Sequence, residues 1–166
     1  TDAKLACLPV RSFRGTFAWV SSALCLQMLR RALELAGLND LPDVPSGLAD
    51  TDAHHYEKGD ARTVLKQGAR IYLEDLDFTA KACPMATEWA DKIAAWVFPT
   101  DEAWQEQFRK RFVVLPDTAF DYLCETGTEV YTRVKIDDET KTVADKALWT
   151  EESLPAETIL AGIVQC

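Results

Sequence analysis

The chain has 166 residues, of which 48% are hydrophobic, and it carries a formal net charge of −9. This length and composition favour one packed domain, and no apolar run approaches the roughly 20 residues that a membrane span needs. The negative charge argues against nucleic-acid binding over the whole surface but leaves room for a local basic groove. The five cysteines have no CxxC spacing, which predicts reduced thiols in a cytoplasmic protein.

The first part of the chain predicts two strands and a helix. Residues 3–12 and 15–22 are apolar and rich in β-prone residues, with a break at the intervening turn. Pro9 indicates an edge position or a bulge in the first strand. A run of leucines at helical spacing follows, and Ser21 or Ser22 can accept a hydrogen bond from the free N–H groups at its start.

Residues 38–68 are rich in Pro, Gly and Asp, which predicts a loop-rich insertion. Part of it, "DTDAHHYE", contains residue types that bind hard or borderline metals, and a metal hydrolase is therefore one hypothesis. The spacing matches no metal template, however, and neighbouring histidines in a polar loop are usually only solvated. The residues concerned are Asp50, Asp52, His54, His55 and Glu57.

The remainder of the chain predicts an α+β fold with a mainly antiparallel sheet, because its strands and helices do not alternate strictly. The second helix should bury one face formed by Trp89, Ile93 and Trp96, and Asp117 should cap a later short helix. The expected elements are a strand at 69–78, helices at 84–98 and 100–111, a buried strand at 111–115, a helix at 116–125, and a final strand at 157–165.

Residues 129–155 form a charged finger whose two arms read as strands around a polar reversal. The first arm, 129–136, has eight residues and is therefore about 26 Å long. The finger is either an arm that lies across a ligand or a neighbouring subunit, or a sheet edge whose charges deter aggregation. Its alternation places Val130, Thr132, Val134 and Ile136 on one face and Tyr131, Arg133 and Lys135 on the other.

Arg11 and Arg14 flank the turn between the first two strands. Paired arginines beside a turn are suited to holding phosphates. The alternative is a solvated turn with an ordinary ion pair.

Two long segments at opposite ends of the chain resemble one known family. They are "TDAKLACLPVRSFRGTFAWVSS" and "RVKIDDETKTVADKALWTEESLPAETIL", and "YLEDLDF" and "RFVVLPDTAFDYL" lie between them in the family's order. On these motifs the chain is similar to the repeated backbone subunit of the type III-B CRISPR Cmr effector complex, a RAMP protein. The resemblance implies a single domain, 1–166, with a modified ferredoxin-like (RRM-type) RAMP fold, a helical insertion and a protruding β-hairpin, the thumb, at 129–155.

The resemblance also implies a function and a set of partners. Copies of such a subunit stack along a CRISPR guide RNA, and each thumb interrupts the guide–target duplex at regular intervals. The implied partners are guide RNA, target RNA, further copies of the subunit and other subunits of the complex, with no membrane. The intact family member silences target RNA in antiviral defence by cleaving it with a divalent metal, and Mg²⁺ is the expected ion.

The chain departs from the family pattern at both ends. The strand, loop and helix that carry the family's essential aspartate, and the Gly-rich loop after the last strand, are expected to be missing. We therefore expect no catalytic residue and no bound cofactor or metal in this chain. Glu151 and Glu152 match positions that assist near the scissile phosphate, although Ser153 stands where the family often has a tyrosine.

The resemblance assigns the RNA contacts residue by residue. Arg133 and Lys135 on the thumb are the expected phosphate contacts, followed by Arg11 and Arg14. Trp149 either stacks on a base or sugar or packs in the core beneath the hairpin. The alternative function is a protein–protein interaction module, in which the finger clasps neighbouring subunits without contacting RNA.

Overall fold

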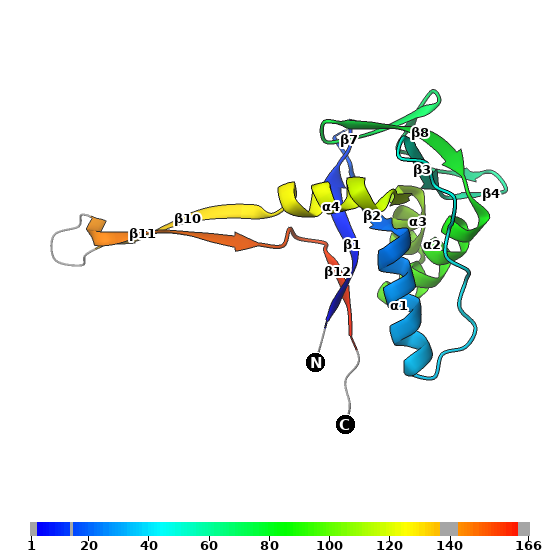
Figure 1. The fold of residues 1–166 in the computed structure, drawn as a ribbon, viewed down its shortest axis with the longest axis horizontal. Coiled ribbons are helices and arrows are strands. Elements are labelled where there is room, and N and C mark those ends of the chain that lie inside the picture. The colour runs from blue at the N-terminus through cyan, green and yellow to red at the C-terminus, as the bar shows by residue number, and fades with distance from the viewer. Residues whose placement is uncertain (1–2, 14, 137–142, 163–166) are drawn as a thin grey trace.

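The computed structural model describes residues 3–13, 15–136 and 143–162. Figure 1 shows a body made of one large sheet with helices packed against it, from which a two-stranded hairpin projects to one side. The sheet has eight strands in the order β12-β1-β2-β9-β3-β8-β7-β6. Its pairings are antiparallel except for β2–β9 and β3–β8, so the prediction of a mainly antiparallel α+β fold is confirmed.

The bounds of the elements follow the expected order in most of the chain. The helices are α1 (Ala23–Leu35), α2 (Pro84–Val97), α3 (Glu102–Arg111) and α4 (Asp117–Thr126). The strands of the large sheet are β1 (Lys4–Arg11), β2 (Phe17–Ser22), β3 (Asp52–His55), β6 (Lys66–Gln67), β7 (Arg70–Leu73), β8 (Leu76–Ala82), β9 (Phe112–Leu115) and β12 (Ile159–Ala161). Two separate pairs are formed by β4 (Glu57–Lys58) with β5 (Ala61–Arg62), and by β10 (Glu129–Ile136) with β11 (Val143–Ser153).

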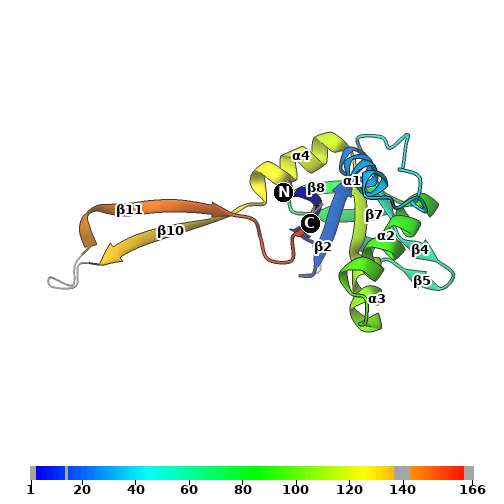
Figure 2. The same ribbon diagram turned by 90° about the horizontal axis from the view of Figure 1, so that it is seen from below.

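The core lies on both faces of the sheet, because successive residues of the central strands point in opposite directions. On β2, Trp19 joins one hydrophobic cluster, while Ala18 and Val20 join the other. The Trp19 cluster includes side chains of α1, α2 and α3, and the second cluster includes side chains of α4 and of β7 and β8. Figure 2 shows α4 separated from α2 and α3 by the strands. None of the described helices is long and apolar enough to cross a membrane.

Helix α1 begins as the sequence predicts, since the Ser22 side chain accepts a hydrogen bond from the Cys25 N–H at 3.2 Å. A second side-chain acceptor also reaches this helix end: Asp117 Oδ1 accepts from the Leu24 N–H at 3.0 Å. Asp117 was expected to cap its own helix, and that prediction is wrong because α4 begins after Pro116 without a side-chain cap. The carboxylate instead ties the start of α4 to the start of α1.

The prediction of mainly loop structure at 38–68 is wrong for its second half. Residues 52–67 contain four short strands, and β3 lies inside the large sheet between β9 and β8. Two polar residues of β3 have partners there: the Asp52 side chain is 7% exposed and accepts from Lys81 Nζ at 2.5 Å. His55 is 1% exposed, with Nδ1 lying 3.0 Å from the Tyr56 carbonyl oxygen.

Two further predictions need correction. The stretch expected as one strand at 69–78 is the hairpin β7–β8, which turns at Glu74, a non-glycine residue with a φ of 50°. In α2, Trp89 and Ile93 are buried as predicted, but Trp96 is 40% exposed. Trp96 lies in the last turn of α2 and leaves a large part of its ring in solvent.

Candidate nucleic-acid interface

The hairpin β10–β11 projects from the body as a two-stranded arm (Figures 1 and 2). Residues 129–134 pair in continuous antiparallel register with residues 148–153, and the register shifts between Val134 and Ile136. Two contacts close its base: Thr128 Oγ1 donates to Glu152 Oε1 at 2.5 Å, and Ser153 Oγ donates to the Glu129 carbonyl oxygen at 3.4 Å. The predicted finger is therefore a hairpin, with both faces available to solvent or to a partner.

One face of the hairpin combines two aromatic rings, an arginine and a glutamate. Arg133 lies directly opposite Trp149, and Tyr131 lies directly opposite Glu151, so the four side chains share this face, which we call the aromatic–arginine face. Glu151 accepts from Arg133 Nε at 3.0 Å and from Trp149 Nε1 at 3.0 Å. The Arg133 guanidinium carbon also lies 5.9 Å from the centroid of the Tyr131 ring, which is within cation–π range.

These contacts perturb two titrations on the aromatic–arginine face. The hydrogen bond from Trp149, followed by that from Arg133, lowers the pKa of Glu151 because both favour the carboxylate. The hydrogen bond of the Tyr131 hydroxyl to Glu129 raises the pKa of Tyr131, since the phenol must keep its proton to donate. Glu151 is thus held as an anion that pairs with Arg133.

The opposite face of the hairpin carries three aliphatic side chains, two threonines and Glu152. Val134 pairs with Leu148, Thr132 with Thr150, and Val130 with Glu152. Val130 is 65% exposed, Val134 is 48% exposed and Leu148 is 64% exposed. We call this the apolar face after Val130, Val134 and Leu148; besides them it holds Thr132, Thr150 and Glu152, and it carries no cation among the described side chains.

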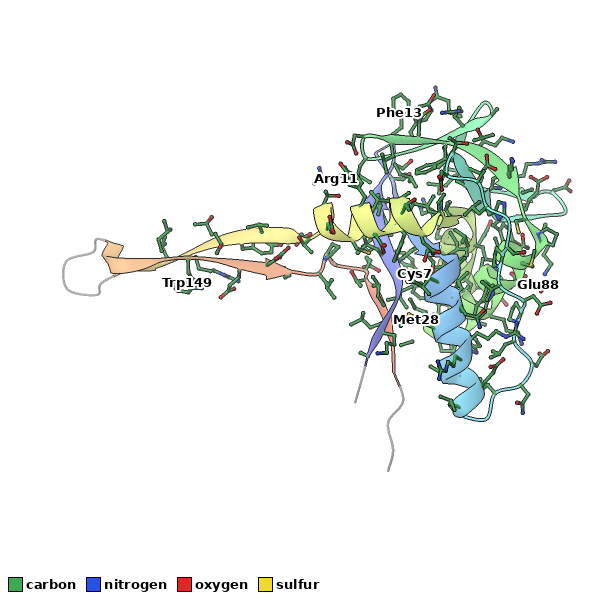
Figure 3. The ribbon with its side chains drawn as sticks, in the orientation of Figure 1. Cys7, Arg11, Phe13, Met28, Glu88 and Trp149 are labelled. Carbon is green, nitrogen blue, oxygen red and sulfur yellow. The ribbon has the colours of Figure 1, made fainter. Side chains whose placement is uncertain are left out.

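The structure separates the predicted assisting residues. Glu151 and Glu152 are neighbours in β11, so their side chains point to opposite faces of the hairpin. Only one of them can therefore approach a given phosphate. Trp149 is 46% exposed on the projecting arm, so it is not a core residue beneath the hairpin; Figure 3 shows it well away from the body.

A cavity of about 580 Å³ lies where the hairpin joins the body. Its walls come from the end of β1, the last turn of α4, the β7–β8 turn and the two ends of the hairpin. Arg11 lines this cavity together with four carboxylate residues, Glu74, Asp75, Glu129 and Glu157. The Arg11 backbone is fixed to the β7–β8 turn, because Glu74 N–H donates to the Arg11 carbonyl at 2.9 Å and Arg11 N–H donates to Glu74 Oε1 at 3.2 Å.

The other predicted RNA contacts fall outside this description. Arg14 lies outside the described residues, and so does the side chain of Lys135. The structure therefore brings Arg133 and Trp149 together on one face and places Arg11 at the base of the hairpin. The roles of all five residues in RNA binding stay predictions.

The residues of the metal-site hypothesis are divided by the sheet. Alternation along β3 sends His54 and His55 to opposite faces, and Asp52 is engaged by Lys81. Burial lowers the pKa of both histidines, because the charged imidazolium is disfavoured away from water. Over the described ranges 3–13, 15–136 and 143–162, no three His, Cys, Asp or Glu side chains come together as metal ligands would.

The family is decided by a match across almost the whole chain, since residues 11–164 match the model of the RAMP superfamily. The chain belongs to the RAMP superfamily. A curated relative of this RAMP chain, "CRISPR system Cmr endoribonuclease Cmr4" of Pyrococcus furiosus (strain ATCC 43587 / DSM 3638 / JCM 8422 / Vc1), is 32% identical over 164 residues. The match covers 98% of the chain and 52% of the relative, so the RAMP chain spans about half the length of the curated relative that it matches.

Solved structures support the same fold. An oligomeric Cmr4 from Pyrococcus furiosus aligns with a TM-score of 0.60 and 26% identity, over 76% of this chain and 47% of that one. A chain of the type III-B Cmr-beta complex bound to cognate target RNA aligns with a TM-score of 0.63 and 17% identity, over 96% and 53% of the two chains. The RAMP chain therefore has the modified ferredoxin-like α+β fold that its motifs indicate.

Sequence reasoning missed some features of the interface. It placed Glu151 near a scissile phosphate but did not pair it with Arg133, because the register of the two arms cannot be fixed from one strand alone. It also passed over Phe13, whose ring is 69% exposed on the β1–β2 turn. The available signal was an aromatic residue between two arginines in "RSFRG".

Proposed function

We propose that this chain is a guide-RNA-binding part of a backbone subunit in a cytoplasmic type III-B CRISPR ribonucleoprotein that silences target RNA in antiviral defence. Its partners in this proposal are guide RNA, target RNA, further copies of itself and other subunits of the Cmr complex. The support is membership of the RAMP superfamily, together with a relative named as a Cmr endoribonuclease. The observation that carries the proposal is the aromatic–arginine face of the hairpin.

The chemistry of that face suits single-stranded nucleic acid. Trp149 offers an exposed ring for stacking, and Arg133 beside it offers a planar cation for a phosphate. Glu151 holds both side chains in place in the absence of RNA. A phosphate that approaches Arg133 exchanges with Glu151, so the arginine is already oriented when the nucleic acid arrives.

The net charge of −9 does not oppose this arrangement, because only the residues that touch the RNA need to be basic. It does predict weak binding by this chain alone and a steep dependence on salt. A stacked filament of copies would supply the remaining contacts by placing successive hairpins along one RNA strand.

For target cleavage we assign no catalytic residue to this chain. The family resemblance implies a divalent metal, but the described residues bring no metal-ligand cluster together, so they do not fit that group. We therefore derive no chemical step through a metal. The contribution of the hairpin in this proposal is to bind and position RNA, with Glu151 and Glu152 on opposite faces.

The apolar face favours a second candidate function. Val130, Val134 and Leu148 are each about half or more exposed on one face, which suits contact with a neighbouring copy. In this alternative the hairpin clasps an adjacent subunit without contacting RNA. The two faces make the two functions separable by mutation.

The proposal is tested by reversing the charge of Arg133. We expect Arg133→Glu to weaken binding of a fluorescein-labelled single-stranded RNA by roughly tenfold or more at low salt, measured by fluorescence anisotropy, because a charged hydrogen bond to phosphate is lost. Lys58→Glu is the matched control: Lys58 is 66% exposed and paired with Asp91, as Arg133 is 57% exposed and paired with Glu151.

The same variants distinguish the alternative when mass is measured by analytical ultracentrifugation. If Arg133→Glu binds RNA as the unmodified chain does, and Val134→Asp lowers the mass of the assembly, the interaction module is the correct function. If Arg133→Glu and Lys58→Glu weaken RNA binding equally, the effect is one of net charge and the proposed interface is wrong.

A further inference from the structure

The turn between β1 and β2 presents an aromatic pair at the surface of the body. Phe13 is 69% exposed, and its ring centroid lies 5.6 Å from that of Tyr72 on β7, at an interplanar angle of 47°. The contact supports the Phe13 ring from one side and leaves most of it in solvent. Figure 3 shows Phe13 at the edge of the body, beyond Arg11 along the same turn.

The described residues of the turn are hydrogen-bonded to one another, and Ser12 joins them to the sheet. Ser12 N–H donates to the Thr16 carbonyl at 2.7 Å, and Gly15 N–H donates to the Ser12 carbonyl at 3.1 Å. Ser12 also forms a bridge with Leu73 of β7 and is 8% exposed. Phe13 thus directly follows a residue whose backbone is hydrogen-bonded within the turn and paired with β7, which limits the ordering that a ligand contacting the ring would require.

Arg11 provides a cation on the same side of the turn. Burial alternates along the backbone here, with Arg11 and Phe13 exposed and Ser12 turned inward. Two residues of extended chain separate them by roughly 7 Å. Within the described part of the chain, no side chain accepts a hydrogen bond from the Arg11 guanidinium, since the carboxylate of Glu74 binds its backbone N–H instead.

A second exposed aromatic pair on this chain differs from the Phe13 pair in the charge of the residues beside it. Trp104 is 45% exposed and stacks on Phe98 with a centroid separation of 5.8 Å. Its neighbours at the start of α3 are Asp101 and Glu102, which would repel phosphates. Phe13 instead lies two residues after Arg11, whose guanidinium has no side-chain acceptor among the described residues, although four carboxylate residues line the cavity beside it. The turn therefore differs from the Trp104 pair in combining an exposed ring face with a nearby arginine.

The size of the aromatic pair argues for a base rather than a protein partner. A stable protein interface buries about 800 Å² on each side around an apolar centre. The surroundings of Phe13 are polar: Ser12 precedes it, and Tyr72 lies opposite Asp77 in the β7–β8 hairpin. One ring face beside one guanidinium matches a single nucleotide, whose base stacks while its phosphate pairs with the arginine.

We propose that Phe13, supported by Tyr72, is a stacking platform for one unpaired nucleobase, and that Arg11 binds a phosphate next to that base. The ligand class is single-stranded RNA, so the inference rests on the proposed function and extends it from the hairpin to the body. A single strand would then contact the chain at two places, with the cavity at the base of the hairpin between the turn and the aromatic–arginine face.

The test uses the whole chain and single-stranded RNA oligonucleotides that carry 2-aminopurine at one position each. We expect one position to lose fluorescence on binding, because stacking quenches 2-aminopurine. Phe13→Ala should restore that fluorescence and weaken binding by about 5- to 150-fold. Phe13→Trp should keep both the quenching and the affinity, whereas Phe13→Leu, which is apolar without a π face, should behave like Phe13→Ala.

Trp104→Ala is the matched control and should leave the affinity unchanged. The inference is overturned if Phe13→Ala binds RNA as the unmodified chain does while Arg133→Glu weakens binding, and the proposed function then stands. It is also overturned if Phe13→Ala and Trp104→Ala weaken binding equally, or if Phe13→Ala lowers only the mass of the assembly, which would indicate a protein contact. If the unmodified chain binds no RNA at any salt concentration, both proposals fail.

Discussion

Replacing Glu151 with glutamine should strengthen RNA binding, although the residue lies in the middle of the proposed interface. In the unbound chain Glu151 Oε2 accepts from Arg133 Nε at 3.0 Å, so an incoming phosphate has to displace a carboxylate. Glutamine has nearly the same shape but no charge, and its side-chain oxygen can still accept from Trp149. Arg133 is then free of its competing anion.

The expected gain in RNA affinity depends on how exposed the Arg133–Glu151 ion pair is to solvent. Arg133 is 57% exposed and Glu151 is 50% exposed, so their ion pair is screened by water and salt and is weak. Its removal should raise affinity by a factor of up to about five. Because one more phosphate is fully neutralised, the slope of log K against log[salt] should become steeper by roughly 0.7.

The assay is anisotropy of a labelled single-stranded RNA at several concentrations of salt. Glu152→Gln is the control, since it removes the same charge one residue away but on the apolar face. We expect it to change affinity less than Glu151→Gln and to leave the slope unaltered. Equal effects of the two variants would mean that only net charge matters, and a weaker affinity for Glu151→Gln would show that the carboxylate is needed and refute the displacement argument.

Two further predictions concern stability. Asp117→Ala should lower the free energy of unfolding by roughly 1 kcal/mol in urea titrations, because the Leu24 N–H loses its acceptor, whereas Asp121→Ala on the same helix should cost less. Burial lowers the pKa of His55, so the unfolded chain takes up a proton first as the pH falls below about 6.5. Stability should therefore be full above that value and decrease below it, and His55→Gln should reduce the loss of urea midpoint between pH 7.5 and 5.5; an equal loss in both proteins would contradict this.

Elements whose defining contacts or patterns lie within a few residues of one another could be predicted from the sequence. Ser22 starts α1 because its hydroxyl meets a free N–H three residues later, which is a contact within one turn. The first hairpin arm could be predicted because its residue types alternate over eight positions, and a strand points successive side chains to opposite faces. Both signals depend on neighbours in the chain, and the structure confirms both.

Elements whose partners lie far along the chain could not be predicted. Strand β3 reads as a polar loop because the lysine that pairs with Asp52 is 29 residues away on β8. The β7–β8 turn carries no glycine or proline, so nothing marked it apart from the left-handed φ of Glu74, which only the structure shows. At the interface, the pairing of Arg133 with Glu151 depends on the register between two strands, which the composition of either strand leaves open.

Because the base of the hairpin is closed by hydrogen bonds, the length of its arms can vary in steps of two residues without changing which residues its faces present. Thr128 and Ser153 tie the two arms together where they leave the body, so a change in arm length need not disturb the sheet. Adding two residues to each arm would extend the reach by about 7 Å and keep every side chain on its present face. Adding a single residue to each arm beside the base would instead exchange the faces, turning Trp149 and Arg133 toward whatever now meets Val134 and Leu148. Natural relatives with longer or shorter arms should therefore differ in steps of two residues per arm if both faces have binding roles.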